Sequence, residues 1–149
     1  EPTAGVDPGA RRDFWEELHV LAARGISVLV STHYMDEAER CHKLGYILNG
    51  RLLAQGTASE VIAGQALITW AVEGEGLPAL AAELRSLPAV EQVTSFGTVL
   101  HVTGSNRERL EAALKPLMAE PGRRWREVEP GLEDVFIHLM RNVGEKEVA

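Results

Sequence analysis

Residues 26–33 read "ISVLVSTH", and this short stretch decides the class of fold that the chain is expected to adopt. Four apolar, mostly β-branched residues stand almost without interruption in it: Ile26, Val28, Leu29 and Val30. Such a run is typical of a strand that is buried on both faces of a parallel sheet. His33 comes where this strand is expected to end, and α/β sheets bind ligands at the carboxyl ends of their strands. The stretch therefore predicts an α/β protein with a buried parallel strand.

A helix is predicted immediately before this strand. Asp7 can accept hydrogen bonds from the first free amides of a helix, and Pro8 suits the first helical position. Gly25 provides a C-terminal stop. A helix that leads directly into a buried strand is half of an α/β crossover. The apolar residues of this helix recur at helical spacing, at Phe14, Leu18 and Leu21.

The sequence after His33 predicts a helix, a hairpin and a second, short helix. Residues 35–44, "MDEAERCHKL", favour a helix. Residues 45–56, "GYILNGRLLAQG", hold two apolar runs around the Asn-Gly pair at 49–50, which is a strong type I′ hairpin signal. Thr57 and Glu60 form a capping box that opens a helix running to about residue 63.

A second domain is predicted to begin after Gly64, so that the domains span 1–64 and 65–149. The second domain has the order β-α-β-β-α-β of the ferredoxin-like α+β fold, followed by a final helix. The expected strand at 123–129 is rich in charge, which suits an edge position. The other strands are expected at 66–74, 90–96 and 98–104, and the final helix at 132–142.

Composition excludes several classes of protein. The net charge of −7 argues against a nucleic-acid-binding protein, which would present a basic face. No apolar stretch approaches the roughly 20 residues that cross a bilayer. Cys41 is the single cysteine, so an internal disulfide is impossible, and we interpret it as a buried structural thiol in a helix. The remaining histidines lack ligand spacing with Cys or carboxylates, so no metal site is predicted: His19, His42, His101 and His138.

The motifs of residues 1–64, in this order and spacing, resemble the ATP-binding subunit of an ABC transporter. They are "EPTAGVDP" at 1–8, the strand that ends in "STH", "YMDEAERC" at 34–41 and "GRLLAQGT" at 50–57. By this resemblance Glu1 is the catalytic carboxylate that ends the Walker B strand, and His33 is the catalytic switch histidine. Asp7 is the D-loop aspartate at the interface between two nucleotide-binding subunits. The sequence "GVDP" differs from the commonest D-loop sequence but keeps the aspartate. Taken singly, Asp7 is an ordinary N-cap and His33 an ordinary loop residue.

The resemblance implies phosphoryl transfer to water, which needs an oriented nucleophile and neutralised charge. A carboxylate such as Glu1 can polarise the attacking water. The imidazole of His33 can donate to the γ-phosphate. The parent protein is expected to use ATP and Mg²⁺, a transmembrane permease subunit and a second ATPase subunit. It would lie in the cytoplasm, at the inner face of the membrane. The tail with "LEDVFIHLMRN" is similar to the C-terminal extension of drug- and polysaccharide-exporting systems.

Two nucleotide-binding motifs are missing from the sequence. There is no G-x-x-x-x-G-K-[ST] loop, which would cradle the phosphates, and no LSGGQ-like signature. The lysines lie outside glycine-rich loops, at Lys43, Lys115 and Lys146. We therefore expect the C-terminal fragment of an ATPase, in which a truncated portion of the P-loop ATPase fold keeps one parallel strand, a hairpin and helices. This fragment should be inactive alone and bind neither ATP nor Mg²⁺.

Two other functions remain open on the sequence. A ferredoxin-like module at 65–149 can serve as a regulatory or dimerisation domain, and an interaction surface is favoured over a metabolite pocket. A soluble ABC ATPase of translation or DNA repair fits less well, because the tail resembles exporter extensions. The apolar strand at 26–30 would have open edges without its neighbours. The fragment is therefore predicted to form a homo-oligomer, a twofold dimer held mainly through residues 1–64.

Overall fold

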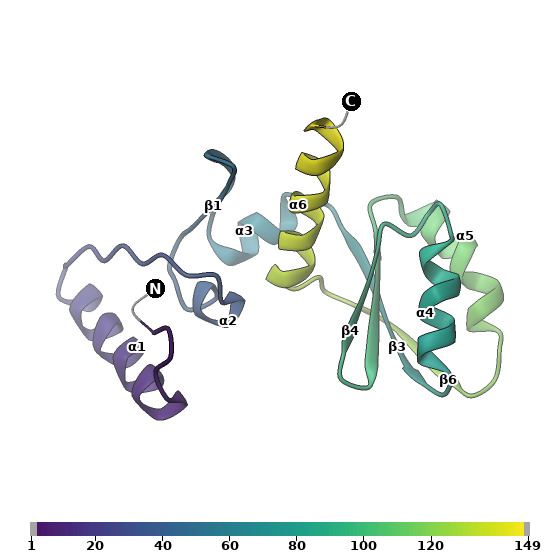
Figure 1. Ribbon diagram of the computed structural model, residues 1–149, viewed down its shortest axis with the longest axis horizontal. Coiled ribbons are helices and arrows are strands. Elements are labelled where there is room, and N and C mark those ends of the chain that lie inside the picture. The colour runs from purple at the N-terminus through teal and green to yellow at the C-terminus, as the bar shows by residue number, and fades with distance from the viewer. Residues whose placement is uncertain (1–2, 148–149) are drawn as a thin grey trace. The chain divides into compact units, whose positions relative to one another are not determined.

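A computed structural model describes residues 3–147 of the chain, with side chains described to residue 143 (Figure 1). The chain divides into two compact units, residues 1–42 and residues 43–149. We describe each unit by itself.

The first unit is built on helix α1 (Pro8–Ala23), which begins and ends where the sequence predicts. The Asp7 carboxylate accepts hydrogen bonds from the amides of Gly9 and Ala10, at 3.0 and 3.1 Å. Gly25 follows the helix with a φ of +86°, a conformation that glycine adopts at little cost. Trp15, only 3% exposed, is the buried apolar anchor of this helix.

The strand predicted at 26–30 is wrong. These residues have no regular secondary structure, and Leu29 is 100% exposed while Ile26 is 50% exposed. A parallel strand needs neighbouring strands for its backbone hydrogen bonds. Residues 3–42 contain no strand to supply them. An apolar, β-branched run therefore does not form a strand in this unit, because the described residues 3–42 hold no sheet for it to join.

The helix predicted over 35–44 is also shorter than expected. Helix α2 spans only Met35–Ala38. Beyond it the amides of Arg40 and Cys41 bond to carbonyls three residues back, at 3.1 and 3.0 Å, in tight turns. Cys41 thus lies in a turn and not in a helix, and Leu44 already begins the next strand.

The second unit opens with the predicted hairpin and capped helix. Strands β1 (Leu44–Leu48) and β2 (Arg51–Gly56) pair antiparallel. Asn49 and Gly50 both have positive φ, at 50° and 71°, as a type I′ turn requires. Helix α3 (Ala58–Ala63) has the complete capping box of Thr57 and Glu60.

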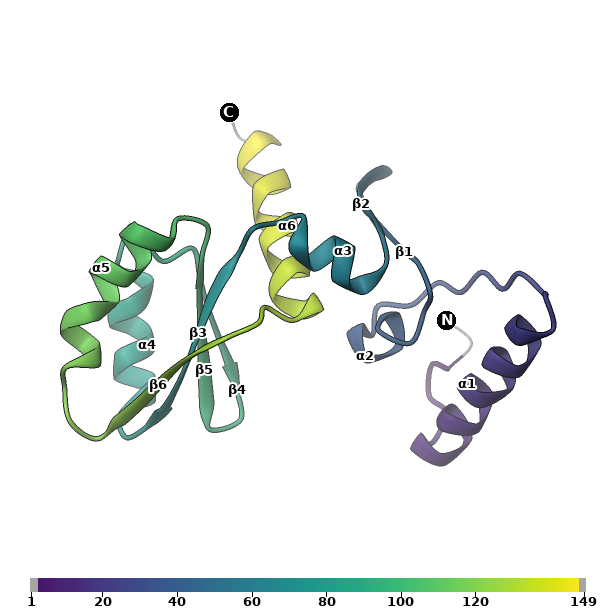
Figure 2. The ribbon, with the colours of Figure 1, turned by 180° about the vertical axis from the view of Figure 1, so that it is seen from behind.

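The rest of the second unit follows the predicted β-α-β-β-α-β order. Its four-stranded sheet is antiparallel throughout, in the order β4-β5-β3-β6, so β6 lies at an edge as predicted. Helices α4 and α5 both cover one face of this sheet (Figures 1 and 2). The bounds are β3 (Ile68–Gly74), α4 (Leu77–Arg85), β4 (Gln92–Phe96), β5 (Val99–Gly104), α5 (Arg107–Met118) and β6 (Arg123–Val128).

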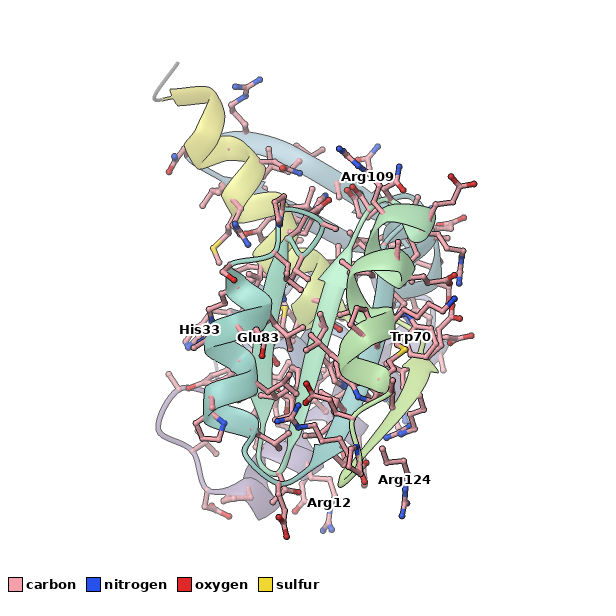
Figure 3. All side chains as sticks on the ribbon, turned by 90° about the vertical axis from the view of Figure 1, so that its right-hand side faces the viewer. Arg12, His33, Trp70, Glu83, Arg109 and Arg124 are labelled. Atoms are coloured by element: carbon pink, nitrogen blue, oxygen red, sulfur yellow. The ribbon has the colours of Figure 1, made fainter. Side chains whose placement is uncertain are left out.

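The apolar core of this unit lies between the sheet and those two helices. Trp70 (Figure 3) and Trp125 are partly buried and pack against this core. Fully burying an aliphatic side chain contributes roughly 1.5–3 kcal/mol, so this cluster supplies most of the unit's stability. Its fully buried members include Val72, Leu80, Leu84, Val102, Leu110 and Leu114.

The other face of the sheet is met by helix α6 (Leu132–Glu147) through polar contacts. His101 alternates along β5 with the core residues and lies 3.3 Å from the carboxylate of Asp134. Asp134, 1% exposed, also accepts the amide of Gly131 at 3.0 Å. Farther along α6, the Phe136 ring packs edge-on against Tyr46 of the hairpin, with ring centroids 4.7 Å apart. Helix α6 therefore links the hairpin to the sheet.

Substituting Gly74 with Ala should strongly destabilise the second unit. Gly74 has a φ of +136°, and a Cβ there would lie 2.3 Å from the backbone oxygen of Gly122. The backbone of the β6 turn would have to move, and we expect a loss of about 3 kcal/mol in the free energy of unfolding. Gly97→Ala is the matched control: its φ is +58° but the space around it is open, so roughly 1 kcal/mol is expected. Equal losses in urea denaturation would contradict this account.

Candidate functional site

The three residues predicted for the site lie in the first unit. Glu1 is outside the described residues. Asp7 is the N-cap of α1. His33 is exposed and lies in the irregular segment before α2, with its ring against that of Tyr34 at a centroid distance of 4.1 Å. The structure thus puts His33 on a loop, not at the end of a strand.

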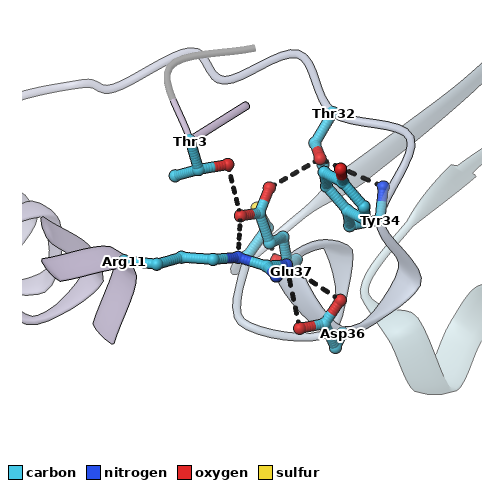
Figure 4. A network of polar contacts seen from close by, with 7 residues as sticks. Thr3, Arg11, Thr32, Tyr34, Asp36 and Glu37 are labelled. Atoms are coloured by element: carbon cyan, nitrogen blue, oxygen red, sulfur yellow. Dashed lines mark hydrogen bonds and ion pairs between the residues drawn. The ribbon is translucent and has the colours of Figure 1, made fainter. Parts of the chain in front are cut away.

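Between these segments lies a buried carboxylate, that of Glu37 in α2 (Figure 4). Its side chain is 1% exposed. One oxygen accepts hydrogen bonds from the Thr3 hydroxyl and from Nε of Arg11, both at 2.6 Å. The other oxygen accepts the Thr32 hydroxyl at 2.6 Å. Two residues that are distant in sequence, Thr3 and Arg11, therefore meet the nearby Thr32 on one side chain.

Arg11 extends this network to the surface. Its terminal nitrogen donates to both carboxylate oxygens of Asp36, at 3.0 and 3.1 Å. Its guanidinium also lies over the ring of Tyr34, with 4.6 Å between the central carbon and the ring centroid. The amide of Tyr34 donates to the Thr32 hydroxyl at 3.1 Å. The residues on both sides of His33 are therefore held by the same cluster.

Hydrogen bonding keeps Glu37 ionised despite its burial. Burial alone raises the pKa of this carboxyl group, but the hydrogen bonds from Thr3, Thr32 and Arg11 together outweigh that effect. The net result lowers the pKa from its ordinary 4.5 to about 2. A buried carboxylate is tolerated only when it is paired and hydrogen-bonded. Glu37 meets both conditions.

Glu37 escaped the sequence analysis because nothing in the sequence distinguishes it. It stands in a run of charged residues with Asp36 and Glu39, which are both exposed. The pattern does not tell which of these neighbours points inward, and the short α2 gives no useful periodicity. Only the tertiary contacts with Thr3 and Arg11 identify it.

The first unit should lose stability in acid because of Glu37. A carboxyl group whose pKa is lowered on folding stabilises the fold above its unfolded pKa, and that contribution disappears as the pH falls toward the folded value. With a shift from 4.5 to about 2, unfolding should become easier by roughly 3 kcal/mol between pH 5 and pH 2. Amide exchange of α1 measures this, and Glu37→Gln should flatten the pH dependence. An α1 equally stable at pH 5 and pH 2 would refute the assignment.

Metal binding and cysteine chemistry are the two other kinds of site that these side chains could form. Among the described residues, no cluster of three or more His, Cys, Asp or Glu side chains is placed to hold a metal ion. Cys41 is half-buried, its thiol lies 3.7 Å from the Glu37 carbonyl oxygen, and burial raises its pKa. A raised pKa disfavours the reactive thiolate, which supports a structural role for this residue.

Comparisons with known proteins identify relatives along nearly the whole chain. The Nod factor export ATP-binding protein I of Ralstonia nicotianae is 40% identical over 144 residues, covering 93% of this chain and 44% of that protein. Its namesake in Neorhizobium galegae is 37% identical over 150 residues, covering 98% and 41%. The probable multidrug ABC transporter ATP-binding protein YbhF of Escherichia coli is 46% identical over 66 residues, covering 44% and 11%. No family model matches the chain.

The chain is therefore a relative of the ATP-binding proteins of ABC transporters, which confirms the resemblance drawn from its motifs. It spans less than half the length of the Nod factor export proteins that it matches. None of the helices within residues 3–147 has the length and apolar character needed to cross a membrane.

Proposed function

We propose that this chain is the C-terminal part of an ATP-hydrolysing subunit that powers export through a membrane permease. The observation that carries the proposal is the extent of the relationship. Similarity to proteins named for export and ATP binding runs over 93% of the chain, and so includes the region after residue 64. An ATPase outside transport is less well supported, since none of the relatives compared above is named as one.

In this proposal Glu1, Asp7 and His33 serve hydrolysis. Glu1 accepts a hydrogen bond from the attacking water and polarises it. His33 donates an N–H to the γ-phosphate, where negative charge develops in the transition state. Asp7 acts at the interface with a second ATPase subunit. The carboxylates of Asp36 and Glu37 are not free to hold Mg²⁺, because both are paired with Arg11.

The region after residue 64 is proposed to be a ferredoxin-like extension, with the domain boundary at 64–65. The sheet order β4-β5-β3-β6 and the two helices on one face support this assignment. We propose that it serves as an interaction surface within an assembly at the inner face of the membrane. Self-association of the isolated chain, as a dimer through residues 1–64, remains a second proposal. The exposed Ile26, Val28 and Leu29 favour it, and light scattering at micromolar concentration tests it.

Replacing His33 with Ala in the whole ATPase tests the function. We expect kcat for ATP hydrolysis to fall about 100-fold, with nucleotide affinity nearly unchanged, because the contact matters most as charge develops. His42→Ala is the matched control, since His42 is also an exposed histidine of the first unit. It should alter kcat by no more than about twofold. A His33→Ala enzyme that hydrolyses ATP normally would overturn the role of His33. The 149-residue chain alone should show no micromolar ATP affinity by calorimetry.

A further inference from the structure

We propose that Glu37 is a positioning residue that fixes the His33 loop, acting through Thr32, and couples it to the segment that carries Asp7. This inference rests on the function proposed above. It goes further by naming residues that touch neither water nor phosphate in the proposed reaction, yet decide where His33 stands.

The His33 loop is held in place by hydrogen bonds of Thr32. Thr32, which precedes His33, donates its hydroxyl to the Glu37 carboxylate at 2.6 Å. The same hydroxyl accepts the amide of Tyr34, which follows His33, at 3.1 Å. One hydroxyl group therefore ties both neighbours of His33 to a buried anion. Hydrogen bonds to an ionised acceptor are about twice as strong as neutral ones.

Arg11 connects Glu37 to Asp7. The amide of Arg11 donates to the backbone oxygen of Asp7 at 2.9 Å, in the first turn of α1. The Arg11 side chain then reaches the Glu37 carboxylate at 2.6 Å. A continuous path of contacts thus runs from Asp7 through Arg11 and Glu37 to Thr32. A movement of the start of α1 displaces Arg11. Because Arg11 and Thr32 bind the same carboxylate, the position of the His33 loop then changes too.

Glu37 differs from its sequence neighbour Asp36 in burial and in its contacts. Asp36 also binds Arg11, but its side chain is 65% exposed whereas that of Glu37 is 1% exposed. Exposed ion pairs contribute little, with a median of about 0–1 kcal/mol. In Figure 4 the Thr32 hydroxyl donates to Glu37, whereas Asp36 is bonded to Arg11. Asp36 is therefore the natural control for loss of charge beside Arg11.

The test measures ATP hydrolysis and nucleotide affinity of the whole ATPase carrying Thr32→Val. This variant keeps the shape of the side chain but removes the hydroxyl that binds Glu37 and Tyr34. We expect kcat to fall about 10-fold, the value of one hydrogen bond to a charged group, while nucleotide affinity is retained. Thr32→Ser restores the hydroxyl and should recover most of the rate, and Asp36→Asn should leave it nearly unchanged.

Combining Thr32→Val with His33→Ala tests whether Thr32 acts through His33. If Thr32 acts through His33, Thr32→Val should have no further effect on kcat in a His33→Ala enzyme, because the two changes remove one interaction chain. Should Thr32→Val prove unstable, Glu37→Gln carries the same comparison from the other end of the hydrogen bond, and Thr32→Ser remains the variant that keeps the hydroxyl. Normal kcat in Thr32→Val, with a large loss in His33→Ala, overturns the positioning role alone. Normal kcat in His33→Ala overturns the role proposed for His33 in hydrolysis, on which the positioning role depends.

Discussion

Replacing Glu1 with Gln should reduce ATP turnover of the whole protein by about 100-fold or more, the range typical for loss of a general base. The amide keeps the size of the side chain but no longer attracts the proton of the attacking water. Binding of ATP should persist, because Glu1 is proposed to act on the water and not on the nucleotide. The Glu1→Gln protein should therefore accumulate as a dimer that retains unhydrolysed ATP.

Single-turnover hydrolysis and filter binding of labelled ATP measure the two properties separately. Glu39→Gln is a suitable control, since Glu39 is an exposed glutamate of the same unit. It should leave both properties unchanged. Turnover near the normal rate in Glu1→Gln would show that another group activates the water.

Replacing Glu37 with Ala should unfold the first unit while the second stays folded. The substitution removes the acceptor of three hydrogen bonds and leaves the Thr3 hydroxyl, 4% exposed, without a partner. Removal of one member of a buried charge pair costs about 3–5 kcal/mol. The first unit has little apolar core besides Trp15 to offset such a loss.

Hydrogen exchange of the 149-residue chain resolves the two units. In Glu37→Ala the amides of α1 should exchange rapidly, while those of β3 and β5 keep their protection. Asp36→Ala, which removes an exposed carboxylate, should leave α1 protected. If α1 remains protected in Glu37→Ala, the buried network does not hold this unit together.

Local sequence signals predicted the local structure well. The Asp7 cap, the Asn-Gly turn at 49–50 and the capping box of Thr57 are all present. Each depends on a few adjacent residues, whose backbone geometry and hydrogen bonds are determined by their own side chains. The order of elements from β3 to β6 was also predictable, because this sheet finds all its strands and both covering helices within one unit.

Features that depend on residues far away in the sequence were predicted wrongly or missed. The apolar run at 26–30 indicates a strand, but a strand exists only when other strands pair with it. The burial of Glu37 could not be predicted from the sequence for a related reason. Its burial results from contacts with Thr3 and Arg11, which lie 34 and 26 residues away, and no periodicity reports such contacts. The proposed roles of Glu1, Asp7 and His33 came from resemblance and remain to be tested.

The exposed segment 26–30 also has a consequence for how this chain behaves in concentrated solution. "ISVLV" is uncharged, free of proline and rich in β-branched residues, and three of its side chains are at least 42% exposed. Short segments of this composition stack into cross-β fibrils when they meet in many copies. A segment whose composition suits the interior of a sheet is therefore an amyloid-forming hazard where it is exposed. A single charged residue placed within it would act as a gatekeeper against fibril growth.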